Sequence, residues 1–187
     1  MQSLQLSIVL ILLPAMALAC GRERWPVKVA SDQNAGLIKA KPIDTTIRYL
    51  VGLPAPPHPD QLRNGRWQGE TSIFRLRNVQ IVWARHERDG DYHLVLRPLR
   101  LSYDSRLRMI AEAPDSRCAQ GSRFLSRIRQ VHRQVRRLIR DLPIRVMMTG
   151  VAFFDVLHRQ HGVAPNGIEL HPILSIQVPH PGAGTDR

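Results

Sequence analysis

Alternating apolar and polar positions predict three successive β-strands in the middle of the chain. These segments are residues 70–86, 91–96 and 107–113. In the first segment, Phe74 and Leu76 alternate with polar neighbours, whereas Val79 and Ile81 continue in the opposite phase. A single change of phase is typical of a β-bulge, which bends a long strand. The turn residues at 87–91 then lead into the second strand.

The apolar period changes to that of a helix between residues 122 and 142. Apolar side chains recur there at steps of three and four residues: Leu125, Ile128, Val131, Val135, Leu138 and Leu142. This spacing predicts an amphipathic helix with one apolar stripe. Pro143 ends it, because proline cannot continue a helix.

Two further strands are predicted, at 144–155 with a glycine at its bend and at 168–178. Pro165-Asn166-Gly167 is a turn signal, so the last strand should run antiparallel to the one before it. Its alternation directs Ile168, Leu170 and Leu174 inward, and Glu169 and His171 outward together. Pro172 has no amide hydrogen and should lie at a bulge or an unpaired edge position.

The order of three strands, a helix and two strands predicts a mainly β fold, an OB-fold-like five-stranded barrel plugged by the helix. A split α+β sheet has a similar order, but the bulged first strand favours the barrel. In such a barrel the first strand pairs with the second and could close against the fifth, and the second pairs with the third.

The amino-terminal residues predict an exported protein, periplasmic or secreted. The apolar run from Leu4 to Pro14 is shorter than the roughly 20 residues of a membrane span, and Ala17-Leu18-Ala19 supplies the small residues of a signal cleavage site. We therefore divide the chain into a signal peptide (1–19), an amino-terminal arm with a proline-rich connector (20–66), the barrel (67–179) and a tail (180–187).

The arm is predicted to be mostly irregular. Trp25–Val29 is expected to be extended, and Asp44 or Thr45 to cap a short helix. The four prolines between Pro54 and Pro59 predict an extended connector.

The two cysteines allow two interpretations. After cleavage Cys20 would be the first residue, where Leu18-Ala19-Cys20 loosely resembles a lipoprotein motif. That alternative predicts a lipid-anchored envelope protein that acts through protein contacts. Alternatively, Cys20 and Cys118 form a disulfide, which on the loop-entropy model adds about 4–5 kcal/mol of stability.

The charge balance points to anionic partners. The chain has 27 basic and 15 acidic residues, a net charge of +12, which attracts an anionic polymer or envelope component. The polar face of the predicted helix carries seven arginines: Arg123, Arg127, Arg129, Arg133, Arg136, Arg137 and Arg140. Four of these arginines are candidates for binding an anionic ligand: Arg129, Arg133, Arg136 and Arg137. A compositional bias toward arginine would equally produce this face, and only 5% aromatic residues argues against single-strand binding by stacking.

Four side chains on the predicted strands could carry chemistry: His93, Glu112, Glu169 and His171. Brought together, imidazole and carboxylate groups suit a zinc-like ion or general acid–base hydrolysis. The alternatives are an exposed pair of little energetic consequence, or a buried histidine bonded to a backbone carbonyl. The chain has no ligand motif of fixed metal spacing and no nucleophile elbow, and its sequence requires no cofactor.

Four further polar residues are ligand-binding candidates: Asp91, Asp155, His158 and Asn166. Each has a structural alternative in its own strand or turn. Asp155 could cap the turn that leaves its strand while His158 packs locally, and Asn166 suits the positive φ angles of a turn.

Several segments resemble a widespread family of exported bacterial proteins of uncharacterised activity. They are RWPVK, DYHLVL, MIAEAP and TGVAFFDVLHRQHGVAPNGIELHPIL. The resemblance extends from about Cys20 to Val178. It implies an OB-like architecture and favours the disulfide between Cys20 and Cys118. The longer loop at 97–108, the arginine-rich helix, Arg159 and His161 depart from the family pattern, which suggests that the basic helix face is not the family's shared function.

Together these features predict an exported OB-like domain, a non-catalytic binding module for an anionic ligand. The main alternative is a metal-dependent or acid–base hydrolase, nuclease-like, that uses the His/Glu cluster.

Overall fold

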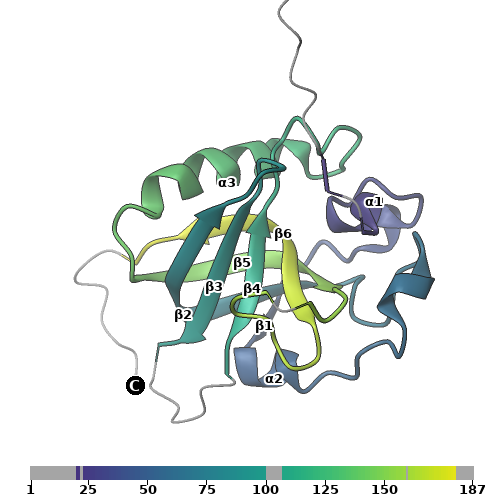
Figure 1. The fold of residues 1–187 in the computed structure, drawn as a ribbon, viewed down its shortest axis with the longest axis horizontal. Coiled ribbons are helices and arrows are strands. Elements are labelled where there is room, and N and C mark those ends of the chain that lie inside the picture. The colour runs from purple at the N-terminus through teal and green to yellow at the C-terminus, as the bar shows by residue number, and fades with distance from the viewer. Residues whose placement is uncertain (1–19, 22, 100–106, 159, 180–187) are drawn as a thin grey trace, which may run out of the picture.

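The computed structural model describes residues 20–21, 23–99, 107–158 and 160–179 (Figure 1). Its strands are β1 (Ile43–Thr45), β2 (Ile73–His86), β3 (Tyr92–Pro98), β4 (Met109–Ala113), β5 (Ile144–Phe154) and β6 (Ile168–Gln177). Its helices are α1 (Trp25–Lys28), α2 (Ile47–Val51) and α3 (Leu125–Leu138), with 3-10 turns η1 (Ala35–Leu37) and η2 (Pro59–Leu62). The predicted signal peptide, the tail and most of the loop at 97–108 lie outside the described residues.

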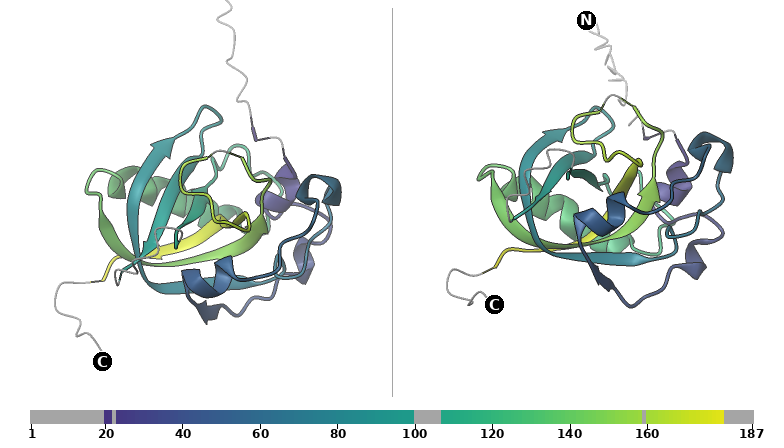
Figure 2. Two further views of the ribbon diagram at one scale, coloured as in Figure 1. Left: turned by 60° about the horizontal axis from the view of Figure 1, so that its bottom comes forward. Right: turned by 90° about the horizontal axis from the view of Figure 1, so that it is seen from below.

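Five strands close into a barrel, as the OB-like prediction required (Figure 2). The strand order is β1-β2-β3-β4-β6-β5, and β2 also pairs with β5. The barrel therefore closes through β2 and β5, and the predicted closure against the last strand was wrong. The reason is that β6 pairs with β4 on one side and β5 on the other, so β5 presents the free edge that meets β2.

The long strand β2 is bulged. Its register shifts between Leu76 and Val79 against β5, and between Ile81 and Trp83 against β3. This confirms the change of phase read from the sequence. The bulges let one strand of 14 residues bend far enough to pair with two neighbours.

Two helices cover opposite ends of the barrel core (Figure 1). Val131 and Val135 of α3 enter the core cluster at one end, and Ile47 and Leu50 of α2 enter it at the other. The α-helix is shorter than the predicted range of 122–142. The apolar stripe of α3 contacts the arm as well as the barrel core, because Ile128 packs against the arm and not the barrel interior.

The amino-terminal arm packs on the outer wall of the barrel. Ala30, Ala35 and Ile38 form an apolar cluster with Ile73, Val151 and Leu174. The inward position predicted for Leu174 was therefore wrong. The cause is the bulge in β6: His171 and Pro172 both lie between the pairs Ala152–Leu170 and Gly150–Ile173, so the alternation reverses after Pro172. The predicted bulge at Pro172 and the antiparallel pairing of β5 and β6 are confirmed.

The local structure of the arm differs from prediction in three places. Trp25–Lys28 is a helical turn with Pro26 in its first turn, where a missing amide hydrogen costs nothing. The cap of α2 is Thr46, whose hydroxyl accepts from the Tyr49 amide, while Asp44 pairs with Arg75 and Arg77 of β2. The connector is extended only as far as Pro59, where η2 begins.

Covalent and ionic links hold the arm in place. Cys20 and Cys118 form a disulfide across 98 residues of sequence, so that expectation is confirmed. Arg24 pairs with the buried Glu70, and Arg66 pairs with Asp32. Arg123, predicted to be part of the solvent face of the helix, donates to the carbonyls of Ala35 and Ile38 in the arm.

Among the described residues, no helix combines the length and the apolar character that crossing a membrane requires.

Candidate functional site

The strand register brings three of the four predicted side chains into one chain of contacts. His93 of β3 lies directly across from Glu112 of β4, with 3.0 Å between Nδ1 and Oε1. The other Glu112 oxygen, Oε2, lies 3.1 Å from Nε2 of His171 on β6. Glu169 lies two residues earlier on the same strand, next to these contacts, but takes no part in them. The predicted pairing of His93 with Glu112 is confirmed.

These side chains are not an exposed surface pair. They point away from the barrel core, as predicted, but only 2% of His93, 9% of Glu112, 2% of Glu169 and none of His171 is exposed. The arm covers His171. Trp25 of α1 lies edge-on to the His171 ring, and the Lys28 carbonyl accepts from His171 Nδ1 at 3.0 Å.

His93 is held as an imidazolium. Its Nδ1 faces the Glu112 carboxylate and its Nε2 faces the His161 carbonyl at 2.9 Å, and both partners are acceptors. Each ring nitrogen must therefore carry a hydrogen. Burial alone would lower the pKa of His93, but the bond to Glu112 and its negative charge raise the pKa above its ordinary value.

Glu112 is the ionised centre of the chain. Burial opposes its charge, but the two histidines and Lys28 outweigh that effect and hold the pKa of the carboxyl well below its usual range. The contact with His171 is close but poorly directed. A hydrogen on Nε2 would not point at Oε2, so the two atoms are near each other without a well-formed hydrogen bond.

Two other buried carboxyls lack full partners. Asp91, just before β3, accepts the Asp115 amide through Oδ1, while Oδ2 has no hydrogen-bond partner among the described residues. Burial raises the pKa of Asp91 to about 8, although the Asp115 amide opposes this. Burial and the charge of Glu112 raise the pKa of Glu169 well above its ordinary value, and Glu169 Oε1 is likewise unpartnered.

Lys28 is the cation that sequence reasoning missed. Its Nζ lies 3.0 Å from Asp155 Oδ2. Burial would lower the pKa of Lys28, but the surrounding charges of Glu169, Asp155 and Glu112 raise it. The residue spacing around Lys28 does not indicate a functional side chain. Lys28 entered the sequence analysis only as part of the RWPVK segment of the family resemblance.

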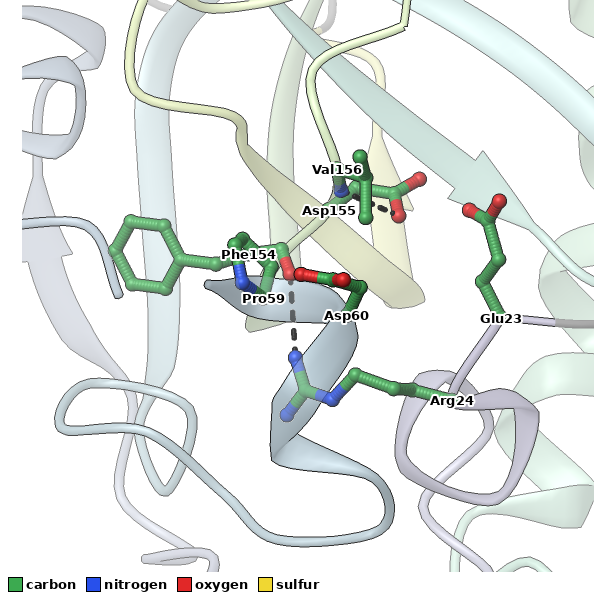
Figure 3. Close-up of a pocket in the computed structure, with 7 residues that line it drawn as sticks. All are labelled: Glu23, Arg24, Pro59, Asp60, Phe154, Asp155 and Val156. Atoms are coloured by element: carbon green, nitrogen blue, oxygen red, sulfur yellow. Dashed lines mark hydrogen bonds between the residues drawn. The ribbon is translucent and has the colours of Figure 1, made fainter. Parts of the chain in front are cut away.

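Asp155 also borders a hollow at the seam between arm and barrel (Figure 3). The hollow has a volume of about 250 Å³ and is lined by Glu23, Arg24, Pro59, Asp60, Phe154, Asp155 and Val156. Glu23, Asp155 and His158 each bring one ligand atom within 4.8 Å of the others. Glu23 and His158 are exposed and pair with each other at 3.0 Å, so this is a surface ion pair beside a buried aspartate.

The remaining candidates separate into structural and surface residues. Asn166 donates to the carbonyls of Leu50 and Leu53 and therefore fixes the β5–β6 turn to α2. Asp155 Oδ1 accepts a hydrogen bond from the Val156 amide, which agrees with the alternative that Asp155 caps the turn after its strand. The four arginine candidates for ligand binding are all exposed on α3: Arg129, Arg133, Arg136 and Arg137.

The position of the buried cluster is informative. OB-folds bind their ligands on the face of the second and third barrel strands and on the loops beside it. In this chain those strands are β3 and β4, and their outer face holds His93 and Glu112. The arm contacts the neighbouring strand β6 at His171, whereas His93 lies against Trp83 of β2 and the His161 carbonyl, so segments of the protein itself cover this face.

Searches with the chain found no matching protein-family model, curated protein or solved structure. The family resemblance noted from the sequence therefore stays a prediction.

Proposed function

We propose that the protein is an exported, non-catalytic binding module that holds an anionic polymer or envelope component on the outer face of α3. One observation carries this proposal. Six arginines on α3 and the turn after it are exposed, and none has a side-chain hydrogen bond or ion pair to another described residue: Arg127, Arg129, Arg133, Arg136, Arg137 and Arg140.

Several arginines elsewhere on the barrel pair with carboxylates. Arg75 and Arg77 share Asp44, Arg85 pairs with Glu87, and Arg117 pairs with Asp115. On α3 the exposed arginines are instead gathered on one helix, and guanidinium groups bind phosphate or sulfate through paired donors. The disulfide suits an oxidising compartment, which supports export.

The other functions have less support. A hydrolase would need a substrate to reach Glu112, but the side chains of His93, Glu112 and His171 are only 3%, 11% and 0% exposed. A lipid anchor would need the Cys20 sulfur, which is engaged in the disulfide.

Binding to a heparin column and to soluble polyphosphate tests the proposal. The test variant changes four arginines of α3 to glutamine: Arg129, Arg133, Arg136 and Arg137. A control of equal net charge changes four exposed arginines elsewhere: Arg48, Arg77, Arg88 and Arg97.

We expect the test variant to elute at lower salt than the control and to bind polyphosphate with a smaller salt dependence. Each lost phosphate contact should reduce the slope of log K against log salt by about 1. Equal losses in the two variants would show that net charge alone matters. Failure of the unmodified protein to bind at low salt would refute the proposal.

A further inference from the structure

Three buried side chains place metal-ligand atoms at one point under the arm. Asp91, Glu112 and His171 each bring one carboxylate oxygen or imidazole nitrogen within 4.8 Å of the other two. The distance between His171 Nε2 and Glu112 Oε2 is 3.1 Å. Two ligands of a tetrahedral zinc ion, with bonds near 2.1 Å, lie roughly 3.4 Å apart. The His171–Glu112 pair is already near this separation, and Asp91 brings its ligand atom within 4.8 Å of both.

Two of these residues each have a side-chain atom without a hydrogen-bond partner among the described residues. The atoms are Asp91 Oδ2 and His171 Nε2, and their residues are 2% and 0% exposed. Buried polar atoms are nearly always bonded, because losing water without replacement is unfavourable. A group bound among Asp91, Glu112 and His171 would supply the missing partners.

The hydrogen bond at His171 Nδ1 indicates which kind of group would bind at Nε2 of the same ring. Nδ1 lies 3.0 Å from the Lys28 carbonyl, which can only accept, so Nδ1 carries the hydrogen. In the neutral ring Nε2 is then a lone pair that faces a carboxylate oxygen. A histidine that binds a metal through one nitrogen usually donates its other ring N–H to a backbone carbonyl, a carboxylate or water.

The surrounding charges also favour a cation. Four carboxyl groups face this region: Asp91, Glu112, Glu169 and Asp155. The opposing positive groups are Lys28, which is paired with Asp155, and His93, which is bonded to Glu112. A divalent ion would stabilise the ionised forms of the carboxyl groups that coordinate it.

We propose that Asp91, Glu112 and His171 bind one divalent transition-metal ion of the Zn²⁺ type. His93 is a positioning residue, because it holds the second Glu112 oxygen. The ligand set differs from the one expected from sequence in that Asp91 takes the place of His93 and Glu169. A site with three protein ligands leaves a further position on the metal. The proposal is independent of anion binding by α3.

Calorimetric titration of the chelator-treated, disulfide-bonded protein with Zn²⁺ tests the site. We expect one ion per chain, and a loss of affinity of more than roughly 100-fold for Asp91→Asn, which exceeds the usual effect of changing a group outside the ligand set. This variant keeps the Oδ1 acceptor for the Asp115 amide, and circular dichroism should show an unchanged fold. The matched control is His158→Gln, which disrupts the exposed cluster of Glu23, Asp155 and His158 and should leave Zn²⁺ affinity unchanged.

A measurement on the unmodified protein avoids dependence on the folding of a variant. Long-range proton–nitrogen NMR spectra should show Zn²⁺ shifting His171 Nε2 while His158 stays constant. Absence of Zn²⁺ binding would overturn the proposal. Binding that shifts His158, or that His158→Gln abolishes, would overturn it in favour of the surface cluster.

Discussion

At the scale of single residues, Glu70 is the carboxylate that joins the arm to the barrel. It is completely buried, and its oxygens accept from both terminal nitrogens of Arg24 in the arm. They also accept from the amides of Trp67, just before β2, and Phe154 at the end of β5. One charge therefore satisfies donors from three separate segments, and the other acceptors for Arg24 are neutral backbone carbonyls.

Replacing Glu70 with glutamine should destabilise the protein by about 3–5 kcal/mol. The change leaves the Arg24 guanidinium buried beside a neutral amide, and an unpaired buried charge is strongly unfavourable. Glu87→Gln is the control. Its pair with Arg85 is largely exposed, so the expected loss is below about 1 kcal/mol. Denaturant unfolding measures both, and equal losses would contradict the role given to Glu70.

The pairing of His93 with Glu112 could be predicted from sequence, because alternation and strand order determine which side chains face each other across two adjacent strands. The burial of Glu169 and His171 could not. Their cover comes from Trp25 and Lys28, more than a hundred positions away in the sequence. Alternation within a strand reports which face a side chain occupies, and it carries no information about what lies on that face.

At the scale of elements, long periodic segments were predictable and short ones were not. The five barrel strands and α3 repeat their apolar pattern over enough residues to be recognised. The segments β1 and α1 have three and four residues, and their conformation depends on the barrel surface they contact. The reversal at Leu174 escaped prediction because a bulge in β6 is set by its pairing with β5.

Gly150, at the bend of β5, permits that pairing. A Cβ atom there would lie 2.8 Å from the Leu170 Cβ and 3.1 Å from the Pro172 carbonyl oxygen. We expect Gly150→Ala to destabilise the protein by about 1–3 kcal/mol, the usual effect of overpacking a closed core. At Gly36 an added Cβ meets nothing within 4 Å, so Gly36→Ala should be near neutral. If thermal unfolding shows both variants to be neutral, the strands do not approach as closely as described.

At the scale of the whole molecule, the arm buries part of the outer face of the barrel. Trp25 and Lys28 of α1 cover His171 on β6, while Trp83 and the His161 carbonyl lie against His93 on β3. The arginines on the outer face of α3 stay exposed. Sequence predicted the two parts of this arrangement, a wrapping arm and a barrel, but their contact depends on partners such as Arg24–Glu70 that no local pattern reveals.

The disulfide should determine whether the arm stays on this wall. Cys20 lies at the start of the arm and Cys118 follows β4, so the bond closes a loop of 98 residues and restricts the unfolded chain. On the loop-entropy model, replacing both cysteines with serine should lower the free energy of unfolding by about 4–5 kcal/mol. Hydrogen exchange at the amides of α1 should accelerate, because Arg24 and Lys28 then hold the arm without a covalent tether. A reductant should have the same effect on the unmodified protein and none on the double variant. If the reduced protein keeps slow exchange in α1, the ionic contacts suffice and the tether is not what keeps the wall closed.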